Sequence, residues 1–283
     1  MQTGSYLDGS WYQPSSDKTI KNLNPADTSD VIAEFPAATA ADVERAIKGA
    51  SEAFESWRKV PAPERARVFW RAAEIARGRV DELGEILCRE EGKVLAEAKG
   101  EIRKGISVLE YYAGAGFRLE GRTIPAEGRN VFTYTIKRPL GVVGLITPWN
   151  FPWAIPVWKA APALIAGNTC VFKPSELTPA TATAMVEIFA EAGLPKGCLQ
   201  MLVGYGEDVG QAIVDHPAVK AVSFTGSNAV GFHVNTCAAK RGAKVTCELG
   251  GKNAIIALAD ADVDAVVGAV MNGAFGSTGQ RCT

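Results

Sequence analysis

From residue 141 onward, short apolar runs alternate with longer segments in which apolar residues recur at helical spacing. The apolar runs are continuous rather than alternating, which is typical of strands buried on both faces of a parallel sheet. Helices between such strands cover the two faces, so this half of the chain is predicted to be α/β, with a Rossmann-like doubly wound parallel sheet. The expected strands are 142–147, 169–173, 198–203, 221–225 and 244–248, and the expected helices are 154–166, 179–192, 208–216 and 228–241.

The N-terminal part of the chain has a different pattern. Residues 1–38 are rich in turn-forming residues and contain short alternating runs, which predict strands and loops. Thr39 and Asp42 form a helix-start signal, and apolar residues at helical spacing then predict a helix over 40–57. Two longer helices are expected at about 64–87 and 90–119.

Residues 122–138 alternate with period two, which predicts an exposed, protruding β-hairpin between the helical part and the doubly wound part. Such a hairpin can provide an oligomer contact or can cover its own domain, and the sequence leaves both roles open. After the last sheet strand, a short strand at 254–258 and a helix at 262–275 are expected to lead to Cys282.

The composition of the 283 residues fits one or two globular domains, with 47% hydrophobic and 22% charged residues. The formal net charge of −1 favours neither nucleic acid nor an anionic membrane as a partner. No apolar stretch approaches the ~18 residues of a membrane span, and the N-terminus lacks the features of a signal peptide. None of the six cysteines form a Cys-x-x-Cys pair, which predicts a reducing, cytoplasmic location. With only two histidines, no metal site is expected.

Candidate chemical residues follow the ends of the predicted strands. Asn150 lies in a proline-stiffened loop, where its amide can serve as an oxyanion donor or can be an ordinary turn asparagine. Glu248 ends another strand beside two glycines, where it can act as a general base on water or be a solvated surface residue. Because the carboxyl ends of parallel strands meet at one edge of a sheet, these side chains are expected to lie together.

Cys282 lies in a loop rich in glycine, serine and threonine and is a candidate nucleophile. Attack on a carbonyl group needs a lowered thiol pKa or a nearby base. His216 precedes a proline and His233 lies within a predicted helix, so neither is well placed to activate the thiol. A hydrolase with a cysteine–histidine pair is therefore disfavoured.

Three motifs can bind a dinucleotide, although each also has a purely structural explanation. Gly204 opens a G-x-G-x-x-x-G turn between a strand and a helix, which can equally be a tight turn. Ser227 begins a helix whose N-terminus can hold a phosphate, or it simply caps that helix. Lys173 and Glu176 can bond ribose hydroxyls or form a solvated ion pair. The Glu176 carboxylate would repel a 2′-phosphate, which favours NAD over NADP.

The chain resembles the NAD(P)-dependent aldehyde dehydrogenase superfamily over essentially its whole length. The resemblance rests on five motifs in this order: Pro-Trp-Asn-Phe-Pro (148–152), Lys-Pro-Ser-Glu (173–176), Phe-Thr-Gly-Ser (224–227), Glu-Leu-Gly-Gly-Lys (248–252) and Gly-Gln-Arg-Cys-Thr (279–283). Residues 109–114 and 239–244 are most similar to the bacterial branch that oxidises α-ketoglutaric semialdehyde (2,5-dioxopentanoate).

The resemblance implies a mechanism and a set of site residues. Cys282 would attack an aldehyde, the Asn150 amide and the Cys282 backbone N–H would hold the oxyanion, and Glu248 would activate water to release the acid. The reaction would pass through a thiohemiacetal and a thioester, with NAD, or alternatively NADP, as the cofactor. The implied cofactor-binding residues are Ile146, Thr147, Pro148, Trp149, Lys173, Ser175, Glu176, Gly206, Gly210, Phe224, Thr225, Gly226, Ser227, Val230 and Leu249.

The resemblance also divides the chain into N-terminal strands and helices of the nucleotide-binding domain (1–121), an oligomerisation hairpin (122–139), a Rossmann-like core (140–251) and the start of a catalytic domain (252–283) that is otherwise largely absent. The complete protein is expected to be a homodimer or homotetramer that acts on a small-molecule aldehyde. This chain alone is expected to have little or no turnover. Two alternatives stay open: a non-redox cysteine acyl-transfer enzyme or esterase, and a dinucleotide-binding fragment without turnover.

Overall fold

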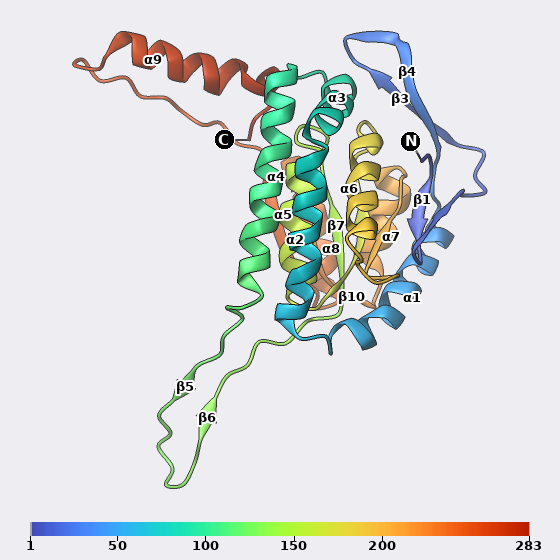
Figure 1. Ribbon diagram of the computed structural model, residues 1–283, viewed down its shortest axis with the longest axis vertical. Helices are drawn as coiled ribbons and strands as arrows, with labels where there is room; N and C mark the ends of the chain where they lie inside the picture. The colour runs from blue at the N-terminus through green and yellow to red at the C-terminus, as the bar shows by residue number, and fades with distance from the viewer. Residues whose placement is uncertain (1, 283) are drawn as a thin grey trace.

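A seven-stranded sheet forms the centre of the molecule in the computed structural model, which describes residues 2–282 (Figure 1). Five strands run parallel, in the spatial order β11 (Lys244–Leu249), β10 (Val219–Gly226), β7 (Val142–Ile146), β8 (Thr169–Lys173) and β9 (Leu199–Met201). The predicted doubly wound parallel sheet is confirmed. Two N-terminal strands extend it beyond β9: β1 (Ser5–Leu7) pairs antiparallel with β9, and β2 (Ser10–Tyr12) pairs antiparallel with β1.

The strand order reverses beside β7. β8 and β9 follow β7 on one side, whereas the chain returns to place β10 and β11 on the other side. Ligands bind such sheets at the carboxyl ends of the strands, in the crevice at the reversal. The loops after β7 and β10 are therefore where the fold is able to hold a bound molecule.

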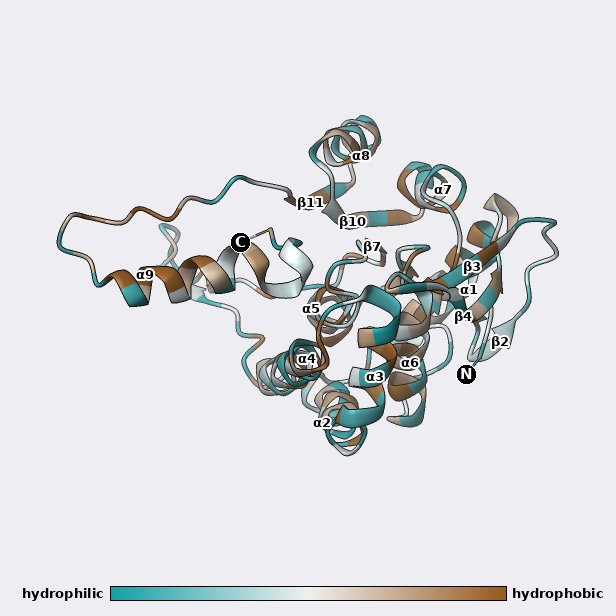
Figure 2. Ribbon diagram, turned by 90° about the horizontal axis from the view of Figure 1, so that it is seen from above, coloured by the Kyte–Doolittle hydropathy of each residue, from teal (hydrophilic) through white to brown (hydrophobic). Residues whose placement is uncertain are grey.

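Helices cover both faces of the sheet (Figure 2). One face carries α1 (Ala40–Trp57), α7 (Gln211–Asp215) and α8 (Asn228–Lys240), and the other carries α5 (Ala154–Ile165) and α6 (Pro179–Glu191). Each face has its own apolar core, with Trp153 and Phe172 on the α5 side and Val171 and Ile213 on the α1 side. Within the described range, no helix combines the length and the apolarity needed to cross a membrane.

The helices that precede the hairpin differ from the prediction at their ends. The single helix expected over 64–87 is two helices, α2 (Ala62–Gly78) and α3 (Val80–Glu91), because Gly78 is a poor helix former and Arg79 leaves helical geometry. The next helix, α4 (Leu95–Ala115), begins later than expected. Gly92 takes a left-handed conformation (φ 89°) that ends α3, which a residue with a Cβ adopts only at a cost.

Two hairpins lie outside the seven-stranded sheet. β3 (Thr19–Asn24) pairs with β4 (Asp27–Pro36) near the N-terminus. β5 (Thr123–Ile124) pairs with β6 (Thr133–Tyr134) on a long arm (Figure 1). The hairpin predicted over 122–138 is therefore present, with a shorter ladder than its alternating pattern suggests.

The C-terminal segment agrees only in part with the sequence pattern. The strand predicted at 254–258 is wrong: these residues have no strand neighbour in the described chain, and a strand needs one for its backbone hydrogen bonds. The helix predicted at 262–275 is present as α9 (Val263–Val270), continued by a π-helical turn (Met271–Phe275). A π-helical turn (Gly206–Gly210) likewise replaces the start of the helix predicted at 208–216. Figures 1 and 2 show α9 extending away from the body, and none of its residues are buried.

Candidate active site

A cleft of about 520 Å³ lies at the carboxyl ends of β7, β8 and β10, and α7 and α8 form its other wall. We call it the β7–β10 cleft. Every residue that the sequence suggested for cofactor binding lines it except Leu249. The lining residues from that set are Ile146, Thr147, Pro148, Trp149, Lys173, Ser175, Glu176, Gly206, Gly210, Phe224, Thr225, Gly226, Ser227 and Val230.

The helical wall of the cleft contains residues that the sequence motifs did not indicate. His233 and Val234 follow Val230 by one helical turn on α8, and Gln211 and Val214 come from α7. Side chains three or four positions apart share one face of a helix, so the position of Val230 could have indicated the first two. Gln211 and Val214 reach the cleft only because of how α7 packs on the sheet. A local sequence motif does not predict that packing.

Lys173 and Glu176 form a pair at the floor of the cleft. The Lys173 ammonium donates to the Glu176 carboxylate at 2.8 Å and to the Pro174 carbonyl at 2.9 Å. Burial of Glu176 raises its pKa, but the charge and the hydrogen bond of Lys173 outweigh burial, so the net pKa lies below the usual value. The cleft therefore presents a carboxylate that is ionised at neutral pH beside a buried ammonium group.

The start of α8 and two glycines form a further part of the cleft wall. The Ser227 hydroxyl accepts a hydrogen bond from the Val230 N–H at 3.4 Å, so Ser227 caps α8 and the start of that helix faces the cleft. Gly206 and Gly210 have ordinary negative φ values, and a Cβ at either position would meet no protein atom closer than 3.9 Å. Nothing in the packing of the chain itself requires these two glycines, and their lack of side chains leaves the cleft wall open to a bound molecule.

A second hollow adjoins the cleft and contains the candidate nucleophile. Asn150, Leu249, Gln280 and Cys282 line it, and it shares Pro148, Trp149 and residues 225–227 with the cleft. We call it the cysteine hollow. The two spaces share these five lining residues, so the cysteine hollow lies next to the cleft.

Asn150 points toward the loop that carries Cys282. Its Nδ2 donates to the Gln280 carbonyl at 2.8 Å, and its Oδ1 is buried without a hydrogen-bond partner among the described residues. The Cys282 carbonyl accepts a hydrogen bond from Asn253 Nδ2 at 2.8 Å. The structure thus brings Asn150 and the cysteine loop together, as the strand-end argument predicts.

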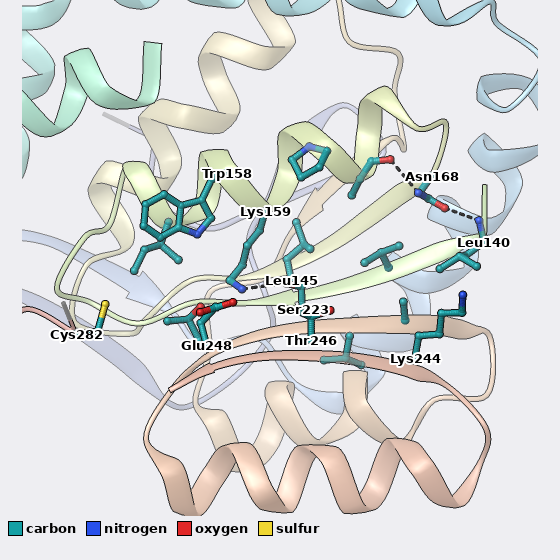
Figure 3. A pocket seen from close by; sticks show the side chains of 17 residues that line it. Leu140, Leu145, Trp158, Lys159, Asn168, Ser223, Lys244, Thr246, Glu248 and Cys282 are labelled. Carbon is teal, nitrogen blue, oxygen red and sulfur yellow. Dashed lines mark hydrogen bonds between the residues drawn. The ribbon is translucent and has the colours of Figure 1, made fainter. Parts of the chain in front are cut away.

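Glu248 shares a third space with Cys282, a groove of about 680 Å³ between α5 and the strands β7, β10 and β11. Figure 3 shows Glu248 and Cys282 at one end of this groove, with Lys159 reaching toward Glu248 from α5. The groove continues to Asn168 and Lys244 at its other end. Cys282 therefore borders two spaces, one that it shares with Asn150 and one that it shares with Glu248.

Lys159 is a charged residue that the sequence reasoning missed. Its ammonium donates to the Ser223 hydroxyl at 2.9 Å, and only 5% of the residue is exposed. Burial lowers the pKa of Lys159 to about 8, and the negative charge of Glu248 opposes part of that shift. The available signal was a single lysine within the otherwise apolar helix α5.

The remaining cysteines and both histidines do not line the two spaces that contain Cys282. Cys282 is the one exposed cysteine, while burial raises the pKa of the Cys198 thiol to about 12 and that of Cys170 further still. No histidine lines either space that contains Cys282 in the part of the chain that the structure describes. His233 instead contacts Gln211 on the far wall of the cleft. The structure offers no cysteine–histidine pair at Cys282.

Comparisons with known proteins give a consistent result. The sequence pattern described as "Aldehyde dehydrogenase family" matches residues 11–283. An α-ketoglutaric semialdehyde dehydrogenase of Bacillus subtilis is 46% identical over 99% of this chain, and a malonate-semialdehyde dehydrogenase of Bacillus pumilus is 41% identical over 98%. The chain spans 57% of the length of each. A point mutant of betaine aldehyde dehydrogenase from Staphylococcus aureus, solved in complex with NAD+, has a TM-score of 0.97 at 34% identity, covering 100% of this chain and 58% of its own.

Proposed function

Because the chain belongs to the aldehyde dehydrogenase family, we propose that the protein containing it oxidises an aldehyde to a carboxylic acid, with Cys282 as the nucleophile and NAD(P) as the cofactor. One observation carries the proposal. The single exposed cysteine lies in a hollow that adjoins the cleft formed by the candidate cofactor residues and shares five lining residues with it. A nucleophile beside a dinucleotide cleft fits oxidation better than simple acyl transfer.

The cleft fits a dinucleotide. The Glu176 carboxylate and the Lys173 ammonium can accept from and donate to ribose hydroxyls, and the start of α8 behind Ser227 can hold a phosphate. The open wall at Gly206 and Gly210 permits close approach. When bound, NAD(P) supplies the group that accepts a hydride.

Covalent catalysis begins at Cys282. Its thiolate adds to the aldehyde carbon, which forms a C–S bond and places negative charge on the former carbonyl oxygen. The Asn150 amide and the Cys282 backbone N–H donate hydrogen bonds to that oxygen. The Asn150 amide carries two N–H groups, so one remains for this role while the other donates to Gln280. Loss of a hydride from the same carbon leaves a thioester on Cys282.

Glu248 completes the reaction. It takes a proton from water, the resulting hydroxide attacks the thioester carbonyl, and the C–S bond breaks to release the carboxylic acid and the cysteine. Its place beside Cys282 at one end of the groove supports this role (Figure 3). Lys159 reaches toward Glu248 from α5, and its ammonium is held by the Ser223 hydroxyl at 2.9 Å.

We further propose NAD rather than NADP as the preferred cofactor, because the charged Glu176 carboxylate would repel a 2′-phosphate on the ribose. The proposed substrate is α-ketoglutaric semialdehyde. The 46% identity to a relative of that name supports it, as do residues 109–114 and 239–244. Malonate semialdehyde is the next candidate, supported by a relative at 41% identity.

The decisive experiment uses the full-length gene product and a panel of aldehydes, with NADH formation as the readout. The wild type is expected to make NADH, and Cys282→Ala is expected to abolish it. Cys88→Ala, which removes a half-buried thiol on α3, is the matched control and is expected to keep wild-type activity. NADH formation by Cys282→Ala would rule out the proposed nucleophile.

The same assay separates the role of Glu248 from that of the nucleophile. Glu248→Gln is expected to keep a first burst of NADH and to slow the steady state by about a hundredfold, because only the hydrolytic step needs the base. Loss of the burst would instead assign Glu248 to thiol activation. Ester hydrolysis by the wild type without NAD, together with no NADH from any aldehyde, would indicate a cysteine esterase.

A further inference from the structure

A buried ion pair lies directly behind Asn150. Lys93, in the turn between α3 and α4, is 1% exposed, and its ammonium donates to Glu101 Oε2 at 2.7 Å and to the Asn150 carbonyl at 2.9 Å. It also lies 4.1 Å from the centre of the Phe151 ring. Removing two charges from water is costly unless their geometry and remaining hydrogen bonds are good. Here every close partner of the ammonium belongs to α4 or to the Asn150 loop, apart from Glu91 at 3.8 Å.

The other oxygen of Glu101 holds the far side of the same loop. Glu101 Oε1 accepts hydrogen bonds from the backbone N–H groups of Trp153 and Ala154, both at 2.9 Å, at the start of α5. These are donors that a helix leaves unpaired at its N-terminus. The backbone on both sides of Phe151-Pro152 is therefore tied to one carboxylate–ammonium pair.

One helical turn earlier, Glu97 holds the loop that carries Cys282. Its Oε2 accepts a hydrogen bond from the Ser277 N–H at 2.9 Å, and its Oε1 lies 3.8 Å from the Arg281 guanidinium. Ser277 is 2% exposed and takes a left-handed conformation (φ 50°) that is unfavourable for a residue with a Cβ. Such a conformation persists where surrounding contacts enforce it.

Glu97 and Glu101 are four residues apart, so they lie on one face of α4. We propose that Lys93, Glu97 and Glu101 are positioning residues. They fix the position of the oxyanion donor Asn150 relative to the Cys282 loop. None of the three lines the cysteine hollow, so their effect on the chemistry is indirect. This inference rests on the proposed function, because it assigns these residues to the site of that reaction.

Lys93→Met tests the tie to Asn150. The methionine fills much of the same volume and leaves the α5 cap of Glu101 in place, while the hydrogen bond to the Asn150 carbonyl is lost. We expect kcat to fall by about tenfold to a hundredfold with KM changed less than about threefold, since small misplacement of a catalytic group costs this much. Lys104→Met, on the exposed side of α4, is the matched control and is expected to leave both constants unchanged.

Glu97→Ala tests the tie to the cysteine loop through a readout that needs no turnover. The rate of Cys282 alkylation by iodoacetamide is expected to change by at least about threefold in Glu97→Ala, because the loop loses its anchor. The rate is expected to stay at the wild-type value in the control Lys104→Met. Glu97→Gln, whose side-chain oxygen can still accept from Ser277, is expected to restore most of the wild-type rate. Equal alkylation rates in the wild type and Glu97→Ala would overturn the role of Glu97.

A purely stabilising role makes a different prediction. Lys93→Met/Glu101→Gln removes both charges of the Lys93–Glu101 pair but keeps an oxygen for the α5 cap, so its urea midpoint is expected to be higher than that of Lys93→Met alone. If positioning is the role, kcat stays low in this double variant; if kcat recovers with stability, the inference is overturned. A wild type that makes no NADH from any aldehyde refutes the proposed function itself. Unchanged kcat in Lys93→Met within an active protein refutes only the positioning role.

Discussion

A single carboxylate decides the expected cofactor preference. Glu176 is ionised at neutral pH because its partner Lys173 outweighs the effect of burial. Glu176→Gln keeps the size of the side chain and an acceptor oxygen while removing the charge that faces a 2′-phosphate. The ratio of NADP affinity to NAD affinity is expected to rise by about tenfold, as removal of ~1–2 kcal/mol of like-charge repulsion implies. Fluorescence titration with both dinucleotides measures this ratio.

A matched variant distinguishes the local repulsion by Glu176 from the effect of the net charge of the cleft. Glu207 also lines the β7–β10 cleft but belongs to the π-helical turn before α7. Glu207→Gln removes the same charge from another wall and is expected to leave the ratio near its wild-type value. An equal rise in both variants would mean that net charge, and not the ribose contact, sets the preference.

The sequence could indicate those site residues whose local sequence context is distinctive. Asn150, Glu248 and Cys282 each stand in a strand-end or glycine-rich context, and the sheet brings them to one edge. Lys159 has no such context, because its role depends on α5 packing across from β11. The Lys93–Glu101 pair was missed for the same reason: burial of a charge is a tertiary property, and both residues read as ordinary surface positions.

Among the secondary-structure elements, α3 and α6 are joined by one buried carboxylate. Glu90 of α3 accepts hydrogen bonds from the Thr181 hydroxyl and from the N–H groups of Ala180 and Thr181 at the start of α6. Because α6 follows the loop that contains Glu176, this contact anchors the helix next to that loop. Burial raises the pKa of Glu90 to about 7, against the opposing effect of these hydrogen bonds.

The raised pKa of Glu90 predicts that the stability of the fold decreases as the pH rises. Between pH 4.5 and about 7 the folded chain keeps a proton on Glu90 that the unfolded chain has lost. The stabilisation is therefore fully present below pH 4.5 and is lost as the pH rises through about 7. Relative to Glu90→Gln, the wild-type free energy of unfolding is expected to fall by on the order of 2 kcal/mol over this interval. Urea denaturation at pH 5 and pH 7.5 measures it, and Glu85→Gln, an exposed site on α3, is expected to show no such difference.

The elements that the sequence predicted well are those whose signal is local. α1, α5, β8 and β11 follow from periodicity and capping and begin and end within a residue or so of expectation. The pairing of β1 with β9 joins Tyr6 to Met201, and no local pattern reveals such a distant neighbour. The strand expected at 254–258 is absent although its local pattern suits a strand. The described chain provides no neighbouring strand with which it could pair.

For the molecule as a whole, exposed apolar side chains gather on the two segments that project from the body. Ile256 and Leu258, which precede α9, are 82% and 70% exposed, and Phe132 on the β5–β6 arm is 75% exposed. Large apolar groups that lie together in solvent mark surfaces that contact another protein segment. We therefore expect both segments to be covered in the assembled protein, and the arm is the one that the sequence already suggested as an oligomer contact.

The arm gives the last prediction. Phe132 and Tyr134 stack at 5.6 Å between ring centres, and both are more than half exposed. Phe132→Ser/Tyr134→Ser removes this apolar surface far from the cleft, so it is expected to lower the mass of the particle in light scattering by at least a factor of about two while leaving NAD affinity unchanged. Val31→Ser, at a 46% exposed position on β4, is the control and should keep the wild-type mass. A monomeric wild type, or an unchanged mass in the double variant, would assign the arm to covering its own domain.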